Sequence, residues 1–206
     1  MKKVFVLGDS ISMQYGPYLK EMLSGLMEYD RKRDDGQAIA DLDQPVGGNG
    51  GDCTCILAYI LENRDMLSRY DCLLLNCGLH DLKVMDWTEK RQVAADEYGR
   101  YLERIAAELQ AIGLHWVWIR TTPVDDDLHN RVKGFRRFNR DVIVYNEIAD
   151  HVMAKYGIPV LDLYGFTSRL GEGLHEDGEH FTKPVRRLQA AYLAGALCFV
   201  GQIRGI

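Results

Sequence analysis

The stretch VFVLGDSIS, from Val4 to Ser12, places an apolar run directly before Gly-Asp-Ser. Polar and apolar residues do not alternate in Val4–Leu7, which is typical of a parallel strand with both faces covered. Gly-Asp-Ser then predicts a tight turn into a helix. Ser10 therefore stands at the carboxyl end of a strand, where a serine can either cap the helix or act as a nucleophile.

Apolar runs and helical patterns alternate along the rest of the chain. We expect strands at Lys3–Gly8, Cys72–Cys77, Trp116–Thr122 and Ile158–Leu163, and a weaker one at Ala38–Asp43. Helical periodicity covers Met13–Glu28, Cys53–Ser68, Lys90–Ala111, Phe138–Lys155 and Val185–Ile203. This alternation predicts a three-layer α/β/α domain with a parallel sheet of about five strands. Nothing in the sequence resembles a linker or a repeat, so we expect a single domain over residues 1–206.

The composition restricts the partners that the protein can have. The formal net charge of −5 gives no basic surface for nucleic acid or for an anionic membrane. No apolar segment approaches the length of a membrane span. The apolar run at the N-terminus is too short for a signal peptide and is interrupted by Asp9. We therefore expect a cytoplasmic protein with no nucleic-acid or membrane partner.

The cysteines indicate neither a disulfide framework nor a zinc site. Their number is five, which is odd, and the members found in apolar runs are Cys72, Cys77 and Cys198. Buried free thiols are the usual state of such residues in a reducing compartment. Cys53 and Cys55 could form half of a metal site, but no second Cys/His pair with zinc-finger spacing accompanies them. We expect no metal site here.

Polar residues collect where the expected strands end. Ser10 follows the first strand, and Asn76–Asp81 follows the third. The loops Gly47–Asp52 and His175–Pro184 add further polar groups. In open α/β sheets, ligands bind beyond the carboxyl ends of the strands. We therefore expect these segments, distant in sequence, to meet at one end of the sheet.

Acyl transfer requires a nucleophilic hydroxyl, a base, a carboxylate that orients the base, and hydrogen-bond donors to the oxyanion. Ser10 can supply the hydroxyl. Asp177 and His180 can supply the carboxylate and the base from one short loop. Gly51 can bring a backbone N–H close to a substrate. His175 lies in the same loop as His180 and is the alternative base.

Four short blocks resemble those of the SGNH, or GDSL-type, hydrolases, and they occur in the same order. They are GDS at Gly8–Ser10, NGGD at Asn49–Asp52, GLHD at Gly78–Asp81 and DGEHFT at Asp177–Thr182. The segments RTTPV, FNRDVIVYNEIADHV and GIPVLDLY are also similar to the later half of that family. The resemblance covers nearly the whole chain. It implies a flavodoxin-like sheet and hydrolysis of esters by a serine, without a metal or other cofactor.

Carried over to this sequence, the resemblance makes Ser10 the nucleophile, His180 the base and Asp177 the residue that orients the base. It also makes the backbone N–H groups of Ser10 and Gly51 donors to the oxyanion.

One position departs from the family pattern. The third block usually reads Gly-x-Asn-Asp, with the asparagine as a side-chain oxyanion donor, whereas this chain has His80 there. An imidazole N–H can donate a hydrogen bond only in the right tautomer or when protonated. We expect His80 to be the third donor, with Asn76 as the rival.

Weaker candidates surround these residues. Those for substrate contacts are Asp9, Asn49, Asp81 and Trp87. Asp9 also suits a purely structural role at a helix start. The longest segment without periodicity, Thr122–Arg137, is a candidate substrate loop.

Charged residues in and after that loop permit two interpretations. Lys133, Arg136, Arg137 and Arg140 share one helical face by their spacing, which indicates either a solvated face or a clamp for an anion. Asp125–Asp127 with His129 could suggest a divalent metal, although aspartates are also common where a chain turns.

The sequence therefore predicts a serine esterase for a small O-acyl ester, with acetyl on a carbohydrate as one candidate by family analogy. A second hypothesis is an SGNH-like scaffold that has lost catalysis and binds a glycan or a protein, which only His80 favours. A third is a flavodoxin-like nucleotide binder, but the chain has no phosphate-binding loop motif.

Overall fold

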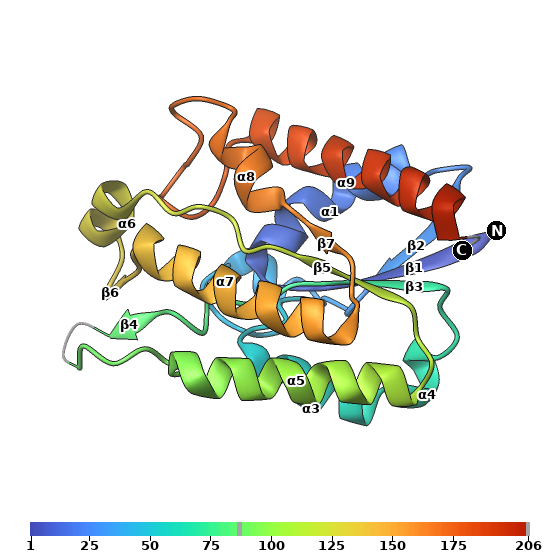
Figure 1. Ribbon diagram of the computed structural model, residues 1–206. Helices are drawn as coiled ribbons and strands as arrows, with labels where there is room; N and C mark the ends of the chain where they lie inside the picture. The colour runs from blue at the N-terminus through green and yellow to red at the C-terminus, as the bar shows by residue number, and fades with distance from the viewer. Residues whose placement is uncertain (86–87, 205–206) are drawn as a thin grey trace.

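A five-stranded parallel sheet forms the centre of the molecule (Figure 1). The computed structural model describes residues 1–85 and 88–204, with side chains described up to residue 198. The strand order is β2-β1-β3-β5-β7. The bounds are β1 (Lys2–Leu7), β2 (Met27–Arg31), β3 (Cys72–Leu75), β5 (Trp116–Ile119) and β7 (Val160–Leu161). This is the flavodoxin-like order, in which the chain starts beside the middle of the sheet and then builds outward on both sides.

Helices cover both faces of the sheet and complete the expected three layers (Figure 1). On one face, α1 (Ser10–Met22) packs against α9 (Lys183–Arg204), and α9 also contacts α8 (Leu163–Ser168). On the other face, α5 (Ala95–Ala111) packs against both α3 (Cys53–Glu62) and α7 (Asn139–Tyr156). The short elements are α2 (Gln37–Ala40), α4 (Arg64–Leu67), α6 (Asp126–Val132), β4 (Val84–Met85) and β6 (Phe135–Arg136). β4 and β6 pair with each other in a small antiparallel sheet.

The middle of the sheet is fully buried, which explains its continuous apolar sequence. Every residue of Val4–Leu7 and of Cys72–Leu75 is buried. Because helices cover both faces, side chains on both sides of each strand need apolar contacts. The run that predicted the first strand is therefore the consequence of this double coverage.

The second strand was placed wrongly by the sequence. It is β2, Met27–Arg31, whereas the expected strand at Ala38–Asp43 overlaps the helix α2. The helix expected to reach Glu28 ends at Met22, and Gly25 then adopts a φ of 77° in the turn that leads to β2. β2 is an edge strand whose residues alternate between half-buried and exposed, so it lacks the continuous apolar run of the central strands.

The segment Thr122–Arg137 is not a loop throughout, because it contains α6 and β6. Lys133 follows α6, Arg136 lies in β6, and Arg140 lies in α7, so these basic residues do not share one helical face. Both interpretations, a solvated helical face and a helical clamp for an anion, were therefore wrong, and Arg137 is fully buried. The helix expected at Cys53–Ser68 is divided at Asn63 into α3 and α4.

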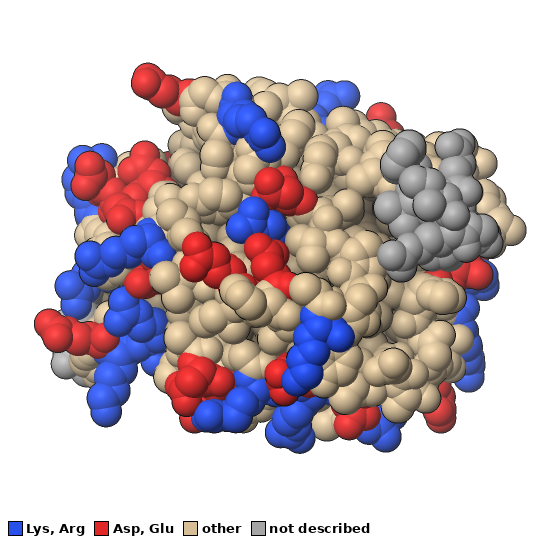
Figure 2. Space-filling model, in the orientation of Figure 1, with Lys and Arg blue, Asp and Glu red and all other residues tan. Residues whose placement is uncertain are grey.

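The charged surface is mixed. On the face seen in Figure 2, basic and acidic side chains are interspersed. No helix in the described ranges 1–85 and 88–204 is long and apolar enough to cross a membrane.

The doubly covered strands predict a clear contrast between two leucines. Leu74 is 0% exposed in the middle of β3, whereas Leu188 is 46% exposed on α9. Leu74→Ala should lower the free energy of unfolding by about 2–5 kcal/mol, because the sheet and its helices cannot close around the cavity. Leu188→Ala should change it by less than about 1 kcal/mol. Urea denaturation followed by circular dichroism measures both, and equal losses would contradict the assigned coverage.

Candidate active site

Ser10 is the first residue of α1, directly beyond the carboxyl end of β1. Asp9, and not Ser10, caps the helix: its Oδ1 accepts a hydrogen bond of 3.0 Å from the backbone N–H of Ile11. Asp9 is buried, and this burial raises the pKa of its carboxyl. The structure therefore gives Asp9 a structural role instead of the expected substrate contact, and it leaves the Ser10 hydroxyl free of capping.

The Ser10 hydroxyl lies at one end of a chain of hydrogen bonds. Its Oγ is 2.9 Å from Nε2 of His180, and Nδ1 of His180 is 2.7 Å from Oδ2 of Asp177. The other carboxylate oxygen of Asp177, Oδ1, accepts hydrogen bonds from the backbone N–H groups of His180 and Glu179, at 2.8 and 3.2 Å. The structure thus brings together the three residues that the sequence selected as nucleophile, base and orienting carboxylate.

The loop that carries Asp177 and His180 is held against α6. The backbone carbonyl of Gly178 accepts a hydrogen bond of 2.8 Å from the N–H of Asp125. Gly178 has a φ of 93°, and a Cβ atom there would lie 2.3 Å from the backbone nitrogen of His129. Only glycine fits this position, for its backbone conformation and for the close approach. The Asp-Gly-Glu-His sequence is therefore suited to docking on α6.

Lys133 is a member of the site that the sequence did not identify. Its Nζ lies 2.7 Å from Oδ2 of Asp177 and 2.8 Å from Oδ2 of Asp43. Burial raises the pKa of Asp177, but its hydrogen bonds with His180 and Lys133 outweigh this effect and hold the pKa well below its ordinary value. Asp177 therefore remains ionised beside His180.

A buried ion pair lies on the other side of the imidazole. Glu179 and Arg137 are both buried and form an ion pair through Oε2 of Glu179. Oε1 of Glu179 lies 3.2 Å from Nε2 of His180. Arg137 follows β6, which pairs with β4, and its Nε donates a hydrogen bond of 2.7 Å to the carbonyl of Leu79. One signal for this pair is visible in the sequence, namely a glutamate directly before the candidate base.

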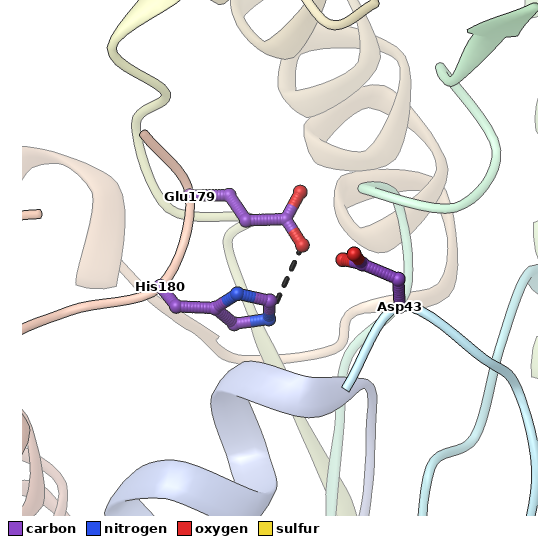
Figure 3. Close-up of side chains that lie close together, drawn as sticks. All are labelled: Asp43, Glu179 and His180. Carbon is purple, nitrogen blue, oxygen red and sulfur yellow. Dashed lines mark ion pairs between the residues drawn. The ribbon is translucent and has the colours of Figure 1, made fainter. Parts of the chain in front are cut away.

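Asp43, Glu179 and His180 point toward one another (Figure 3). Each offers one ligand atom, and these atoms lie within 4.8 Å of one another, so this is the group of described residues that could hold a metal. Lys133 is already bound to Asp43, and Arg137 to Glu179. Both carboxylates thus have a cationic partner, which opposes the binding of a metal ion beside them.

His80 lies at the carboxyl end of β3 with a neutral ring. It is 2% exposed. Burial, assisted by the nearby charges of Arg137 and Lys83, lowers the pKa of His80 to about 3. One ring nitrogen therefore carries a hydrogen that is available for donation.

Asn76, the rival donor, is already engaged inside the fold. Its Nδ2 donates to the carbonyl of Ile119 at 2.9 Å and lies 3.4 Å from Oγ1 of Thr121. Both hydrogens of the amide are therefore directed at the end of β5 and the residues after it. This geometry disfavours Asn76 as an oxyanion donor.

The glycine-rich loop is held by its own asparagine. The N–H of Gly51 donates to Oδ1 of Asn49 at 3.0 Å, and Nδ2 of Asn49 donates to the carbonyl of Leu42 at 3.0 Å. Asn49 therefore has a structural role instead of the expected substrate contact. The oxyanion role of Gly51 stays a prediction, which requires its N–H to be shared between Asn49 and the substrate.

The remaining candidates lie elsewhere or serve the fold. Oδ1 of Asp81 accepts the N–H of Cys53 at 2.9 Å, and burial raises the pKa of Asp81 to about 7, so the expected substrate contact is replaced by a hold on α3. Nε2 of His175 lies 3.1 Å from the carbonyl of Pro123, which makes it a poor alternative to His180. Trp87 lies outside the described residues.

Comparison with solved structures identifies the fold. A lipase/acylhydrolase from Enterococcus faecalis aligns over 96% of this chain and 95% of its own, with a TM-score of 0.71 and 18% identity. A GDSL-like lipase from Bacteroides thetaiotaomicron aligns over 97% of this chain and 89% of its own, with a TM-score of 0.70 and 14% identity. An acetyl xylan esterase aligns over 95% of this chain and 99% of its own, with a TM-score of 0.69 and 16% identity. The chain therefore has the fold of the SGNH, or GDSL-type, hydrolases. The sequence itself matches no protein-family model and no curated protein.

The buried neutral histidines predict a loss of stability in mild acid. Burial also lowers the pKa of His129 to about 3, as it does for His80. An unfolded histidine has a pKa near ~6.5, so between these values the unfolded chain binds more protons than the folded one. Each of the two histidines therefore lowers the stability as the pH falls, by up to about 2 kcal/mol at pH 5, whereas the raised pKa of Asp81 acts in the opposite direction and offsets part of this loss.

Urea denaturation at pH 7 and pH 5 measures this loss. His80→Asn should reduce the loss of unfolding free energy between pH 7 and pH 5. His151→Gln, at an exposed position, should leave that loss unchanged. An equal loss in the two variants would show that His80 is not the source.

Proposed function

We propose that the protein is a serine esterase that hydrolyses a small O-acyl ester through Ser10, His180 and Asp177. The proposal rests on the hydrogen-bonded chain from Ser10 Oγ to His180 Nε2, at 2.9 Å, and from His180 Nδ1 to Asp177 Oδ2, at 2.7 Å. These contacts are short enough for proton transfer from the hydroxyl to the imidazole. The shared fold with lipases and esterases supports it.

In the first half-reaction, Ser10 Oγ forms a bond to the carbonyl carbon of the ester while its proton moves to Nε2 of His180. The carbonyl π electrons move to the oxygen and give a tetrahedral oxyanion. When the carbonyl re-forms, the bond to the alkoxy oxygen breaks. That oxygen takes the proton from Nε2, the alcohol leaves, and the acyl group remains on Ser10.

In the second half-reaction, water takes the place of the alcohol. His180 accepts a proton from the water as its oxygen attacks the acyl carbon. Collapse of the second tetrahedral oxyanion breaks the bond to Ser10, whose oxygen recovers the proton from Nε2 as the carboxylic acid leaves. Asp177 stays ionised throughout, holds the Nδ1–H of His180, and stabilises the imidazolium that forms twice per cycle.

The oxyanion donors in this proposal are the backbone N–H groups of Ser10 and Gly51 and the imidazole N–H of His80. Ser10 begins α1, so its N–H also lies at the positive end of the helix dipole. His80 is neutral and therefore donates from one of its two ring nitrogens. Donors of this kind act most strongly where water is excluded, as at these buried positions.

The acyl group that we propose is small, with acetyl on a carbohydrate as the first candidate. An acetyl xylan esterase shares the fold over nearly its whole length, which supports this choice by analogy alone. The rival function is a binding module without catalysis, which the replacement of asparagine by His80 favours. The complete chain of Ser10, His180 and Asp177 argues against the rival, because binding alone does not need it.

Ser10→Ala tests the proposal most directly. Turnover of acetate esters should disappear, because the covalent route needs the hydroxyl, while the fold should persist, because Asp9 caps the helix. A fluorophosphonate probe should label the wild type, and EDTA should change neither labelling nor turnover. Ser168→Ala, at an exposed position on α8, is the control and should behave as the wild type. Undiminished turnover in Ser10→Ala would refute the nucleophile, and an unlabelled wild type would favour the binding module.

His80 is tested by substitution with alanine and with asparagine. Loss of one oxyanion donor typically lowers kcat by about 10²–10³. His80→Ala should show such a loss with a smaller change in KM, because the hydrogen bond is made mainly in the transition state. His80→Asn should keep much of the activity, since an amide N–H can donate at a similar position. If His80→Ala keeps kcat within about twofold of the wild type while Asn76→Ala lowers kcat strongly, Asn76 is the side-chain oxyanion donor.

A further inference from the structure

A buried carboxylate lies beside the nitrogen of His180 that performs the chemistry. Glu179 is 1% exposed, and its Oε1 is 3.2 Å from Nε2 of His180. The same nitrogen is 2.9 Å from Oγ of Ser10. In the proposed reaction Nε2 gives its proton to the leaving alcohol, whose oxygen must therefore come within hydrogen-bond distance of it. The atoms next to that oxygen consequently meet the carboxylate of Glu179.

Arg137 keeps this carboxylate ionised and in place. Burial lowers the pKa of Arg137 to about 10, so the guanidinium remains protonated at neutral pH. It pairs with Oε2 of Glu179 and is itself anchored by the carbonyl of Leu79. Since Arg137 takes Oε2, the oxygen that faces the reacting atoms is Oε1. A carboxylate fixed in this way is a preorganised acceptor.

The chemistry of Oε1 restricts the alcohols that fit. An ionised carboxylate only accepts hydrogen bonds, and a buried one left without a donor is costly. A hydroxyl on the carbon adjacent to the one that bears the ester oxygen can donate to Oε1 while the ester oxygen takes the proton from Nε2. A methyl group in the same place cannot donate, and it removes the water that would otherwise do so. The positive charge of Arg137 balances Glu179, so a donor is favoured over a mere cation.

We propose that Glu179 determines specificity by selecting esters whose alcohol carries a free hydroxyl on the carbon adjacent to the ester-bearing carbon, as in monoesters of polyols and sugars. The proposal rests on the esterase function proposed above, and it names the side of the substrate that the site recognises. Glu179 takes no proton in the reaction; it accepts a hydrogen bond from the leaving group.

The test uses acetate esters of nearly equal size. 2-Hydroxyethyl acetate and propyl acetate differ by a hydroxyl in place of a methyl group, and acetylcholine carries a cation without a hydroxyl. The wild type should have a kcat/KM at least about tenfold higher for 2-hydroxyethyl acetate than for either of the others, because sites built around a substrate hydroxyl discriminate strongly.

Two variants assign this preference to Glu179. In Glu179→Leu with Arg137→Met, both charges are removed and similar volumes are kept, which avoids an unpaired buried charge. The ratio between 2-hydroxyethyl and propyl acetate should fall to within about twofold in this variant. Glu172→Leu, at an exposed position in the same segment, should keep the wild-type ratio. A ratio is insensitive to a general loss of active protein, and labelling by a fluorophosphonate confirms that each variant is folded.

Several results would overturn the proposal. The first is a wild-type kcat/KM for 2-hydroxyethyl acetate within twofold of that for propyl acetate. The second is a higher kcat/KM for acetylcholine. The third is a double variant that keeps the wild-type ratio between 2-hydroxyethyl and propyl acetate. If the double variant does not fold, the ratio of kcat/KM between 2-hydroxyethyl and propyl acetate in the wild type still tests the proposed substrate preference. A wild type that the fluorophosphonate labels but that hydrolyses none of these acetates would reject the substrate class alone. A wild type that is neither labelled nor active would reject the esterase function itself, and this proposal with it.

Discussion

The parallel pairing of β1 with β2 on one side and with β3 on the other sends the chain away from β1 in opposite directions. At such a switch point the loops beyond the carboxyl ends of the strands diverge. Ser10 stands there directly after β1, and His80 follows the end of β3. The loop with Asp177 and His180 reaches Ser10 from far along the chain and is held there by a backbone hydrogen bond to Asp125, the residue before α6. The site is thus a consequence of strand order, and the remaining elements hold its parts in register.

Charge neutralisation is the second condition that the site must meet. Two of its carboxylates, on Asp177 and Glu179, lie in a region of low water content, where an unpaired charge would be expensive. Lys133 and Arg137 neutralise them separately, one on each side of the His180 ring. Both cations come from the segment that joins α6 to α7. The start of α6 therefore supports the loop of Asp177 and His180 by backbone contact, and the segment after α6 supports it by charge.

The sequence reveals the parts of this arrangement that depend on local pattern. The central strands are evident because double coverage demands continuous apolar residues, whereas β2 is hidden because an edge strand can carry MEYDR. Ser10, Asp177 and His180 are recognisable as residues at strand ends within family-like blocks. Lys133 and Arg137 are not recognisable from the sequence, because their spacing indicates one helical face. In the structure, Lys133 follows the end of α6 and Arg137 follows the short strand β6. Their partners are set by tertiary packing, which no local pattern encodes.

Lys133 holds Asp43 and Asp177 at the same time, so the two carboxylates share one positive charge. Ser10 and His180 are only 2% and 3% exposed, and a carboxylate oxygen of Asp43 lies within 4.8 Å of an imidazole nitrogen of His180. Asp43 is therefore coupled to the ring of His180 both by proximity and through the shared cation. A change of charge at Asp43 alters how strongly Lys133 attracts Asp177, and Asp177 transmits that change to the Nδ1 nitrogen of His180.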